Sequence, residues 1–403
     1  ATWLFGGLCS AVSLGFSVQV AHFIGANDFV KARQVMRHAL VATLAFSLLV
    51  TLCASLIAFR LPGWLRGGDD IAHDASLYFL IYALSVPFLQ LGILSSNMLK
   101  SAGNMQIPSI MSVLMCVLDV CFNYLFIYVA GLGVPGAALG TVLSIAIVAS
   151  VEAWFALFRS SILALRLDKE RFVWMWSYVR NAVKISAPIA AQYVLMSGAQ
   201  IVSTYIVAPL GNFAIAANTF AITAESLCYM PGYGIGDAAT TLVGQSMGAG
   251  QYGLCRSFAK LTVGMGMAVM ALMGVVMYVF APEMIGLMTP VEEIRDLGTQ
   301  VLRIEAFAEP MFAAAIVGNC VCVGAGDTLK PSLMNLASMW GVRLTLAAVL
   351  AHWYGLQGVW TAMAIELTFR GTLFLVRLKW GAWLRAEDGV EKNNAGGGRQ
   401  ALS

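Results

Sequence analysis

Long apolar runs alternate with short polar stretches along almost the entire chain. Most runs reach about 20 residues, which as a helix crosses a hydrocarbon core of roughly 30 Å. No water is available there to bond the backbone, so a helix is favoured because it pairs its own N–H and C=O groups. The pattern predicts an all-α polytopic membrane protein with eleven spans at 2–24, 38–60, 75–99, 106–130, 134–158, 185–209, 214–246, 258–281, 297–323, 332–351 and 354–376.

The span 214–246 is too long for one straight crossing. It contains the stretch "MPGYGIG" at 230–236. Pro231 removes a helix hydrogen bond and the glycines loosen the backbone, so we expect the helix to be interrupted and kinked there.

Composition agrees with the apolar pattern. Apolar residues make up 59% of the 403 residues and charged residues only 11%, against about a quarter charged in an ordinary soluble domain. The net charge of +3 is small, and no basic face or aromatic stacking platform accompanies it. We therefore expect no nucleic-acid partner, and the bilayer itself is the main environment.

The distribution of Lys and Arg predicts orientation. Eighteen of them lie in one set of alternate connections and in the C-terminal tail, whereas the opposite connections hold three, Arg60, Arg66 and Arg295. Basic residues accumulate on the cytoplasmic side of membrane proteins. We expect the richer set and the C-terminus to be cytoplasmic, in the inner (cytoplasmic) membrane of a cell.

Two short stretches of the sequence are nearly the same. "GNMQIPSIM" begins at Gly103 and "GDTLKPSLM" at Gly326, and the offset of 223 also pairs Pro108 with Pro331. Both read as short cytoplasmic turns in which Asn104 or Asp327 is available to cap the next helix. The same offset recurs elsewhere, aligning Arg33 with Arg256, Pro87 with Pro310 and, with one slipped residue, "GLGVPGAA" (131–138) with "GLQGVW" (355–360).

A repeat without inversion indicates two helical bundles related by an axis along the membrane normal. We expect an incomplete N-terminal lobe at 1–160, a cytoplasmic linker at 161–184, a C-terminal lobe at 185–381 and a polar tail at 382–403. The span 185–209 has no partner in the first half, so we expect one further helix before residue 1, which gives six helices in each lobe.

Four stretches resemble the multidrug and toxic compound extrusion (MATE) family. They are "AESLCYMPGYGIGDAATTLVGQSMGAG" (224–250), "EPMFAAAIVGN" (309–319), "GAGDTLKPS" (324–332) and "GLGVPGAALGT" (131–141). The resemblance implies a two-lobed antiporter that expels organic cations in exchange for H⁺ or Na⁺. In many members the first helix, which we expect to precede residue 1, carries a coupling carboxylate. Asp237 departs from the small or apolar residue expected at its position.

Seven acidic residues fall within the expected spans. A carboxylate in hydrocarbon is costly and often marks a proton or ion path. Five of them lie in the second half, and their repeat partners in the first half are neutral. Ion coupling is therefore expected in the C-terminal lobe. The seven are Asp119, Glu152, Glu225, Asp237, Glu305, Glu309 and Glu366.

Glu225 is the leading candidate for cation coupling. It precedes Pro231 by six residues and is followed by Tyr229, Met230 and Tyr233, which with Pro231 form the expected substrate pocket or hinge. An interhelical hydrogen bond is the alternative role.

Glu305 and Glu309 are four apart, so a continuous helix would place them on one face. Glu305 has an alternative as the partner of Arg303 at the outer end of the span. Glu309 precedes Pro310 and is the stronger candidate of the two.

The remaining charged residues read mainly as structural. Glu366 and Arg370 have the spacing of an intrahelical ion pair. Arg343 requires an anion, and a bridge to Asp119 in the other lobe is one possibility. Glu152, near a cytoplasmic span end, is expected to extend toward the headgroups, and Asp237 stays a weaker candidate.

Other chemistry is sparse in this sequence. Eight cysteines and four histidines lack ligand spacing, and no nucleophile–base pair is evident. We expect no enzyme activity, no metal site and no cofactor beyond H⁺ or Na⁺ as coupling ion. The expected protein is a monomeric exporter of small organic cations. The alternatives are a flippase for lipids or lipid-linked oligosaccharides, which would need more basic residues within its spans, and a channel or receptor.

Overall fold

The computed structural model describes residues 2–58, 69–167, 172–380 and 383–384. Helices account for nearly all of these residues, and no strand occurs among them, which confirms the all-α fold class. The expected tail at 382–403 falls almost wholly outside the described residues, as do Arg60 and Arg66. Contacts divide the chain into two compact units, residues 1–190 and 191–403, with the division inside one long helix, α7.

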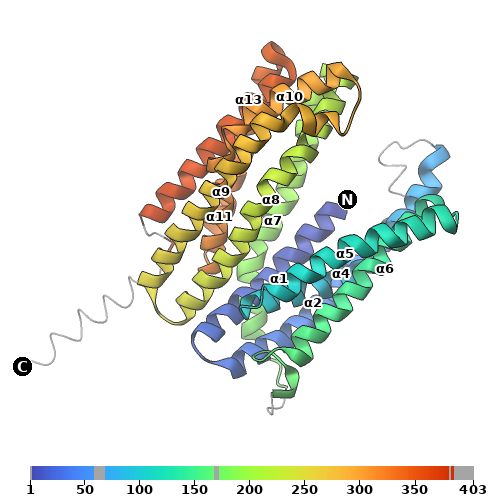
Figure 1. The fold of residues 1–403 in the computed structure, drawn as a ribbon. Coiled ribbons are helices and arrows are strands. Elements are labelled where there is room, and N and C mark those ends of the chain that lie inside the picture. The colour runs from blue at the N-terminus through green and yellow to red at the C-terminus, as the bar shows by residue number, and fades with distance from the viewer. Residues whose placement is uncertain (1, 59–68, 168–171, 381–382, 385–403) are drawn as a thin grey trace, which may run out of the picture. The chain divides into compact units, whose positions relative to one another are not determined.

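The first unit contains the first five long helices and the start of α7, and the second contains the remainder (Figure 1). Short π-helical or 3₁₀ segments (η) extend several of the α-helices. In chain order the elements of the first unit are α1 (Thr2–Gly25), α2 (Phe29–Ile57), α4 (Asp69–Ser101), α5 (Gln106–Tyr124), η1 (Leu125–Val129), α6 (Gly133–Trp154), η2 (Phe155–Arg159), η3 (Leu165–Leu167) and α7 (Trp176–Val207).

The second unit continues from α7 with a set of longer and more interrupted helices. They are η4 (Ala208–Leu210), α8 (Asn212–Gly248), α9 (Tyr252–Gly286), α10 (Glu292–Ala306), α11 (Glu309–Gly324), α12 (Leu329–Ala337), η5 (Ser338–Arg343) and α13 (Leu344–Lys379).

Helix boundaries reproduce the sequence repeat. Adding 223 to the first residues of α2, α4 and α5 gives the first residues of α9, α10 and α12. The last residue of α4, Ser101, likewise maps to Gly324, which ends α11. One long helix in the first unit therefore corresponds to a bent pair in the second.

The repeated turns use the same backbone geometry in both units. Gly103 and Gly326 have φ of +83° and +80°, a left-handed conformation that glycine adopts without steric cost. Asn104 accepts the Ile107 N–H at 3.2 Å, as expected for a cap. Asp327 instead forms an ion pair with Arg377 near the end of α13, so the capping role expected for it is wrong.

Pro108 and Pro331 occupy the first turns of α5 and α12 and are buried. A proline in the first turn removes no intrahelical hydrogen bond, because those N–H groups have no partner in the helix. Both prolines thus follow their glycine turns at positions where a helix can begin.

The second unit corrects two of the expected spans. α8 runs unbroken over 37 residues through Pro231, so the predicted interruption at 230–236 is wrong. The span expected at 297–323 is instead two helices, α10 and α11, bent by 60° at the break between them.

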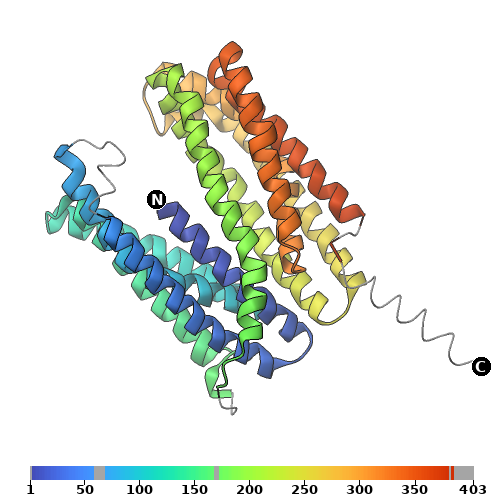
Figure 2. The ribbon, with the colours of Figure 1, turned by 180° about the vertical axis from the view of Figure 1, so that it is seen from behind.

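The final two expected spans, 332–351 and 354–376, meet inside α13. Gly355 there has φ +58° and ψ −136°, which is not helical. Figure 2 shows the chain reversing direction between two segments of α13. Two antiparallel spans thus follow one another without a loop.

Eight helical segments in the described residues are long and apolar enough to cross a membrane, or nine if the bent pair is one span. The chain is therefore a multi-pass membrane protein. α8 is not among the eight. Its polar side chains include Glu225 and Asp237, and it is central to the site described below.

Small residues line the buried side of α8. Ala217, Ala221, Ala224 and Cys228 recur at intervals of three or four and belong to the large apolar core of the second unit. Small side chains let membrane helices approach closely, which replaces the missing hydrophobic drive with van der Waals contact. Glu225 lies next to this stripe, so it is carried into the core.

Candidate functional site

Glu225 is buried in the second unit, with only 4% of its surface exposed. It follows Ala224 and precedes Cys228 on the buried side of α8. A glutamate there has lost most of its hydration, which is costly unless a proton, a cation or hydrogen bonds replace the water.

Two further glutamates lie at the break between α10 and α11. Glu305 is in the last turn of α10, and Glu309 is the first residue of α11. The two were expected on one face of a continuous helix, and that expectation is wrong because the 60° bend separates them. Each belongs to a different helix end, and both have 0% exposure.

The carboxylate oxygens of Glu305 and Glu309 have no hydrogen-bond partner among the described residues. The pairing of Glu305 with Arg303 is also not found: the Arg303 side chain donates to the Tyr278 carbonyl at 3.2 Å. Unpaired ionised carboxylates in a protein interior are strongly disfavoured. These two groups therefore require protons or a bound cation.

Arg343 supplies positive charge at this site. Its guanidinium is close enough to Glu225 and Glu305 for a charge–charge interaction with each, and it contacts the Met363 sulfur. Arg343 ends the π-helical segment η5. The anion that the sequence required for Arg343 is thus found within its own unit.

The carboxylates also interact with one another. Glu305 experiences the charges of Glu225, Glu309 and Glu366, and Glu309 experiences that of Glu225. Like charges this close cannot all be ionised without compensation. One arginine cannot neutralise the three carboxylates of Glu225, Glu305 and Glu309 together, so the cluster has spare capacity for positive charge.

Glu366 is neutralised separately. Arg370 lies 3.1 Å from its carboxylate, which gives the ion pair expected from their spacing. The Ser338 hydroxyl donates to Oε1 of the same Glu366 carboxylate at 2.6 Å. The Glu366–Arg370 pair therefore carries no net charge.

Aromatic rings border the acidic cluster. Tyr229, one turn after Glu225, packs edge-on against Phe312 at 5.6 Å between centroids. The Arg370 guanidinium lies over the same Phe312 ring at 5.8 Å. Tyr229 also contacts Tyr233 at 5.8 Å. The site thus joins buried carboxylates to aromatic faces, which attract cations.

Other residues predicted for the site lie outside this cluster. Met230 and Tyr233 are 54% and 49% exposed, because they occupy the side of α8 away from its buried stripe. Asp237 is half-buried and twelve residues beyond Glu225, about 18 Å along a helix. It therefore lies outside the acidic cluster.

Asp119 belongs to the first unit and is half-buried on α5. Its Oδ1 has no hydrogen-bond partner among the described residues, and neither has Oδ1 of Asn123 one turn later. The bridge from Asp119 to Arg343 stays a prediction. Glu152 is buried on α6, so the expectation that it extends toward the headgroups is wrong.

Three residues of the site were not singled out from the sequence. Phe312 and Ser338 have side chains typical of any membrane helix, and only the folded arrangement brings them to Arg370 and Glu366. Gly274 on α9 is the third. A Cβ there would lie 2.7 Å from the Ala306 carbonyl oxygen and 3.3 Å from the Glu309 Cβ.

Comparison with known proteins identifies the family. The MatE family model matches residues 1–125 and 188–349. A probable multidrug resistance protein NorM of Thermotoga maritima is 25% identical over 388 residues, covering 94% of this chain and 83% of the relative. A probable NorM of Neisseria meningitidis serogroup B is 24% identical over 360 residues, covering 86% of this chain and 76% of the relative.

Solved structures share the same fold. A crystal structure of a MATE protein in complex with MaL6 superposes with a TM-score of 0.89 at 19% identity, covering 95% of this chain and 87% of the other. The Vibrio cholerae MATE transporter VcmN in its bent form gives 0.86 at 18% identity, with coverage of 96% and 87%.

Proposed function

Because the chain belongs to the MatE family of multidrug efflux transporters, we propose that it is a secondary antiporter that exports organic cations in exchange for H⁺ or Na⁺. Members of this family are transporters rather than enzymes. The observation that carries the proposal is the group of three buried glutamates, Glu225, Glu305 and Glu309, two of which interact with Arg343.

The charge balance of this cluster supports exchange. With Glu366 neutralised by Arg370, three carboxylates face one guanidinium, so two negative charges remain when all three are ionised. Burial makes that state unfavourable, and two protons or cations relieve it. A cation that enters the site therefore competes with the coupling ion for the same carboxylates.

The break between α10 and α11 is a second feature that favours ion binding. Broken helices near the middle of transporter spans present free backbone groups and helix ends to ions. The C-terminus of α10 and Glu309, the first residue of α11, lie at such a break. In the proposed mechanism, loading and unloading this site biases the alternating access of two lobes.

The aromatic border favours organic cations as the exported compounds. Tyr229 and Phe312 present ring faces and edges beside the carboxylates, and cation–π contact with a desolvated cation is worth about 2 kcal/mol. The Met363 thioether next to Arg343 adds a flexible, polarisable wall. Such surfaces accept ligands of several shapes.

The test is efflux from proteoliposomes that hold the full-length protein. A fluorescent lipophilic cation is loaded, and a pH gradient and a Na⁺ gradient of equal size are imposed separately. Antiport predicts that one of the two gradients drives efflux and that its collapse stops it. Efflux that is indifferent to both gradients would support a channel and contradict the proposal.

We also propose a cytoplasmic location for the C-terminus and the 161–184 segment, in the cell's cytoplasmic membrane. The uneven distribution of Lys and Arg supports this orientation. In a cysteine-free background, cysteine at Glu293 should react with an impermeant thiol reagent added outside intact cells. Cysteine at Arg166 should not, and the reverse pattern would overturn the orientation.

A further inference from the structure

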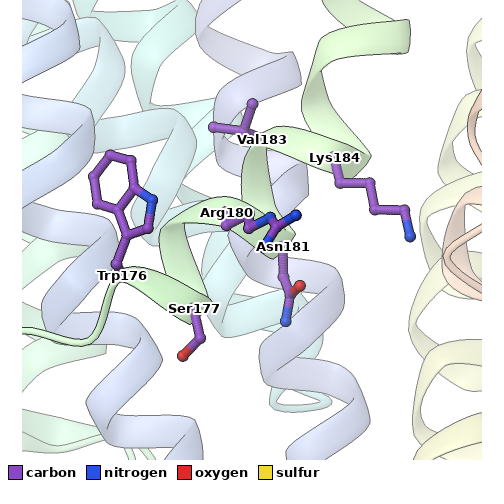
Figure 3. A pocket seen from close by; sticks show the side chains of 6 residues that line it. All are labelled: Trp176, Ser177, Arg180, Asn181, Val183 and Lys184. Atoms are coloured by element: carbon purple, nitrogen blue, oxygen red, sulfur yellow. The ribbon is translucent and has the colours of Figure 1, made fainter.

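The first turns of α7 have one side that is buried and an opposite side that is exposed and basic. Tyr178, Val179 and Ala182 are buried in the first unit, whereas the opposite side of the same turns is exposed. That exposed side holds two bases and no acid. It consists of Trp176, Ser177, Arg180, Asn181, Val183 and Lys184, which line an open hollow of about 740 Å³ (Figure 3).

Arg180 and Lys184 are four residues apart, so both project from the same side of α7. Figure 3 shows Trp176 and Lys184 toward opposite ends of the group, with Arg180 between them. Neither base has an ion pair or a hydrogen bond within the described part of the chain. Two adjacent, uncompensated bases provide a site for an anion.

The segment leading into α7 is held rigidly by His38 of α2. The Met175 N–H donates to His38 Nε2 at 2.8 Å. The ring must therefore carry its proton on Nδ1, which donates to the Gln34 carbonyl at 2.7 Å. His38 is itself buried. This contact fixes the backbone one residue before Trp176, at the edge of the hollow.

Aromatic packing reinforces the same contact. The His38 ring lies 5.0 Å from both Phe172 and Trp174, and 5.2 Å from Tyr178, between ring centroids. The bases on α7 are thus presented by a preformed turn, which lowers the ordering cost of binding.

The residues beside the bases are apolar and exposed. Trp176 is 66% exposed, and Val173 and Trp174 on the preceding segment are exposed as well. Tryptophan beside basic residues is typical of the membrane–water interface, where its ring reaches the headgroup level. A basic cluster next to a membrane helix attracts anionic lipid headgroups.

We propose that this face of α7 binds the headgroup of an anionic phospholipid. Arg180 and Lys184 pair with the phosphate, Ser177 and Asn181 offer hydrogen bonds to its oxygens, and Trp176 packs at the level of the glycerol backbone. The leaflet follows from the orientation proposed above. The lipid would hold the start of α7, and with it residues 172–175, at the membrane surface.

Native mass spectrometry of the full-length, delipidated protein tests this proposal directly. Phosphatidylglycerol and phosphatidylcholine are added in equal amounts, and the retained lipid is counted. Each base near an anionic surface contributes a roughly fivefold factor in affinity. The Arg180→Gln/Lys184→Gln double variant should therefore bind phosphatidylglycerol about thirtyfold more weakly than wild type.

Arg256→Gln/Lys260→Gln is the matched control. It removes two exposed bases at the same spacing from α9, a helix whose sequence contains no tryptophan. It should retain phosphatidylglycerol as wild type does. A Trp176→Ala variant should lower retention without any change in charge, and its melting temperature shows that it is folded.

Several outcomes would overturn the proposal. They are equal retention of the two lipids by wild type, unchanged retention by the α7 double variant, and equal losses in the two double variants. Displacement of the lipid by inorganic phosphate would assign the face to a soluble anion, and a changed oligomeric state alone would assign it to a second copy. Because lipid retention is measured without transport, failure here is distinct from failure of the antiport assay.

Discussion

Glu305 is the second-last residue of α10 and Glu309 is the first residue of α11, with Phe307 and Ala308 in the break. The first turn of a helix favours an anion, because the unpaired N–H groups give it a partial positive charge. Glu309 lies at that favourable end of α11, whereas Glu305 lies at the unfavourable end of α10. The two carboxylates, four residues apart, are therefore unequal acids of one site.

Neutralising Glu225 should abolish gradient-driven efflux. Glu225→Gln keeps the shape of the side chain and its ability to donate a hydrogen bond but removes its charge, so a cation and a proton no longer compete there. We expect efflux at the rate of protein-free liposomes, with normal folding and insertion. The same is expected of Glu309→Gln.

Glu293→Gln is the control for both variants, because Glu293 is exposed at the start of α10 and outside the cluster. It should transport as wild type. Wild-type efflux by Glu225→Gln across the same gradient would make that carboxylate structural and would place coupling elsewhere in the protein.

Gly274→Ala should damage the helix break. The added methyl group would lie within contact distance of the Ala306 carbonyl and the Glu309 side chain, and overpacking of this kind costs about 1–3 kcal/mol. Transport and melting temperature should both fall.

Gly264→Ala on the same helix provides the comparison, because nothing lies within 4 Å of its added Cβ. An alanine in a helix interior is favoured over glycine by roughly 0.5–1 kcal/mol, so this variant should be as stable as wild type or slightly more so. Equal melting temperatures for the two variants would show that the contacts at Gly274 do not matter.

Glu366→Gln should retain most transport, because Arg370 neutralises Glu366 separately from the acidic cluster. Complete burial of Glu366 changes the expected result for stability. The substitution leaves Arg370 without its partner, and breaking a buried ion pair costs on the order of 3 kcal/mol. We expect a lower yield and melting temperature, while each correctly folded molecule still transports.

The matched double variant Glu366→Gln/Arg370→Met removes both charges and should recover part of the lost stability. Normal stability of the single variant would show that water or lipid compensates Arg370.

Asp28 should stabilise the start of α2 through its charge and its cap. It accepts the Lys31 N–H at 3.1 Å and its carboxylate lies 2.7 Å from the Lys31 ammonium. These bonds hold the pKa of Asp28 below its usual range. A lowered folded-state pKa contributes stability that is present above about pH 4 and is lost as the pH falls through the folded value.

Asp28→Ala should cost about 1 kcal/mol, the usual value of an N-cap, seen as a lower melting temperature at pH 7. Asp28→Asn should keep most of the cap and lose the acid-dependent part. If Asp28→Ala and wild type melt alike at pH 7 and differ only in acid, the cap contributes nothing.

The fold was largely predictable because the lengths of the apolar runs and the repeat can be read directly from the sequence, without knowledge of how the helices pack. The turns at Gly103 and Gly326 are examples, since a motif that repeats at a fixed offset needs the same backbone twice. The two prolines Pro231 and Pro310 led to opposite errors: a break was expected at the first, and an unbroken span across the second. Pro231 lies inside an intact α8, whereas the chain breaks just before Pro310. A proline alone does not say which of these happens, because neighbouring helices decide.

The site was predictable only in part. Glu225, Glu305 and Glu309 could be found because buried acids are rare in apolar spans. Their relation to Arg343 could not, since it depends on how η5 packs in the second unit. Ser338 and Phe312 gave no signal, because their importance lies entirely in what they contact.

The π-helical segment η5 has a consequence for how the two halves diverged in length. The offset is 223 at Gly103 and Gly326, but Gly131 and Gly355, which begin the matching "GL" turns, are 224 apart. One extra residue therefore lies between these points in the second half, whose π-helical segment Ser338–Arg343 has six residues against five in Leu125–Val129, the π-helical segment in the same interval of the first half. A π-turn absorbs one additional residue while the α-helix on each side keeps its register. An insertion that would elsewhere rotate every later side chain by about 100° is thus confined to one turn. We expect deletion of a single residue within 338–343 to be tolerated by the fold far better than a deletion in α8 or α11.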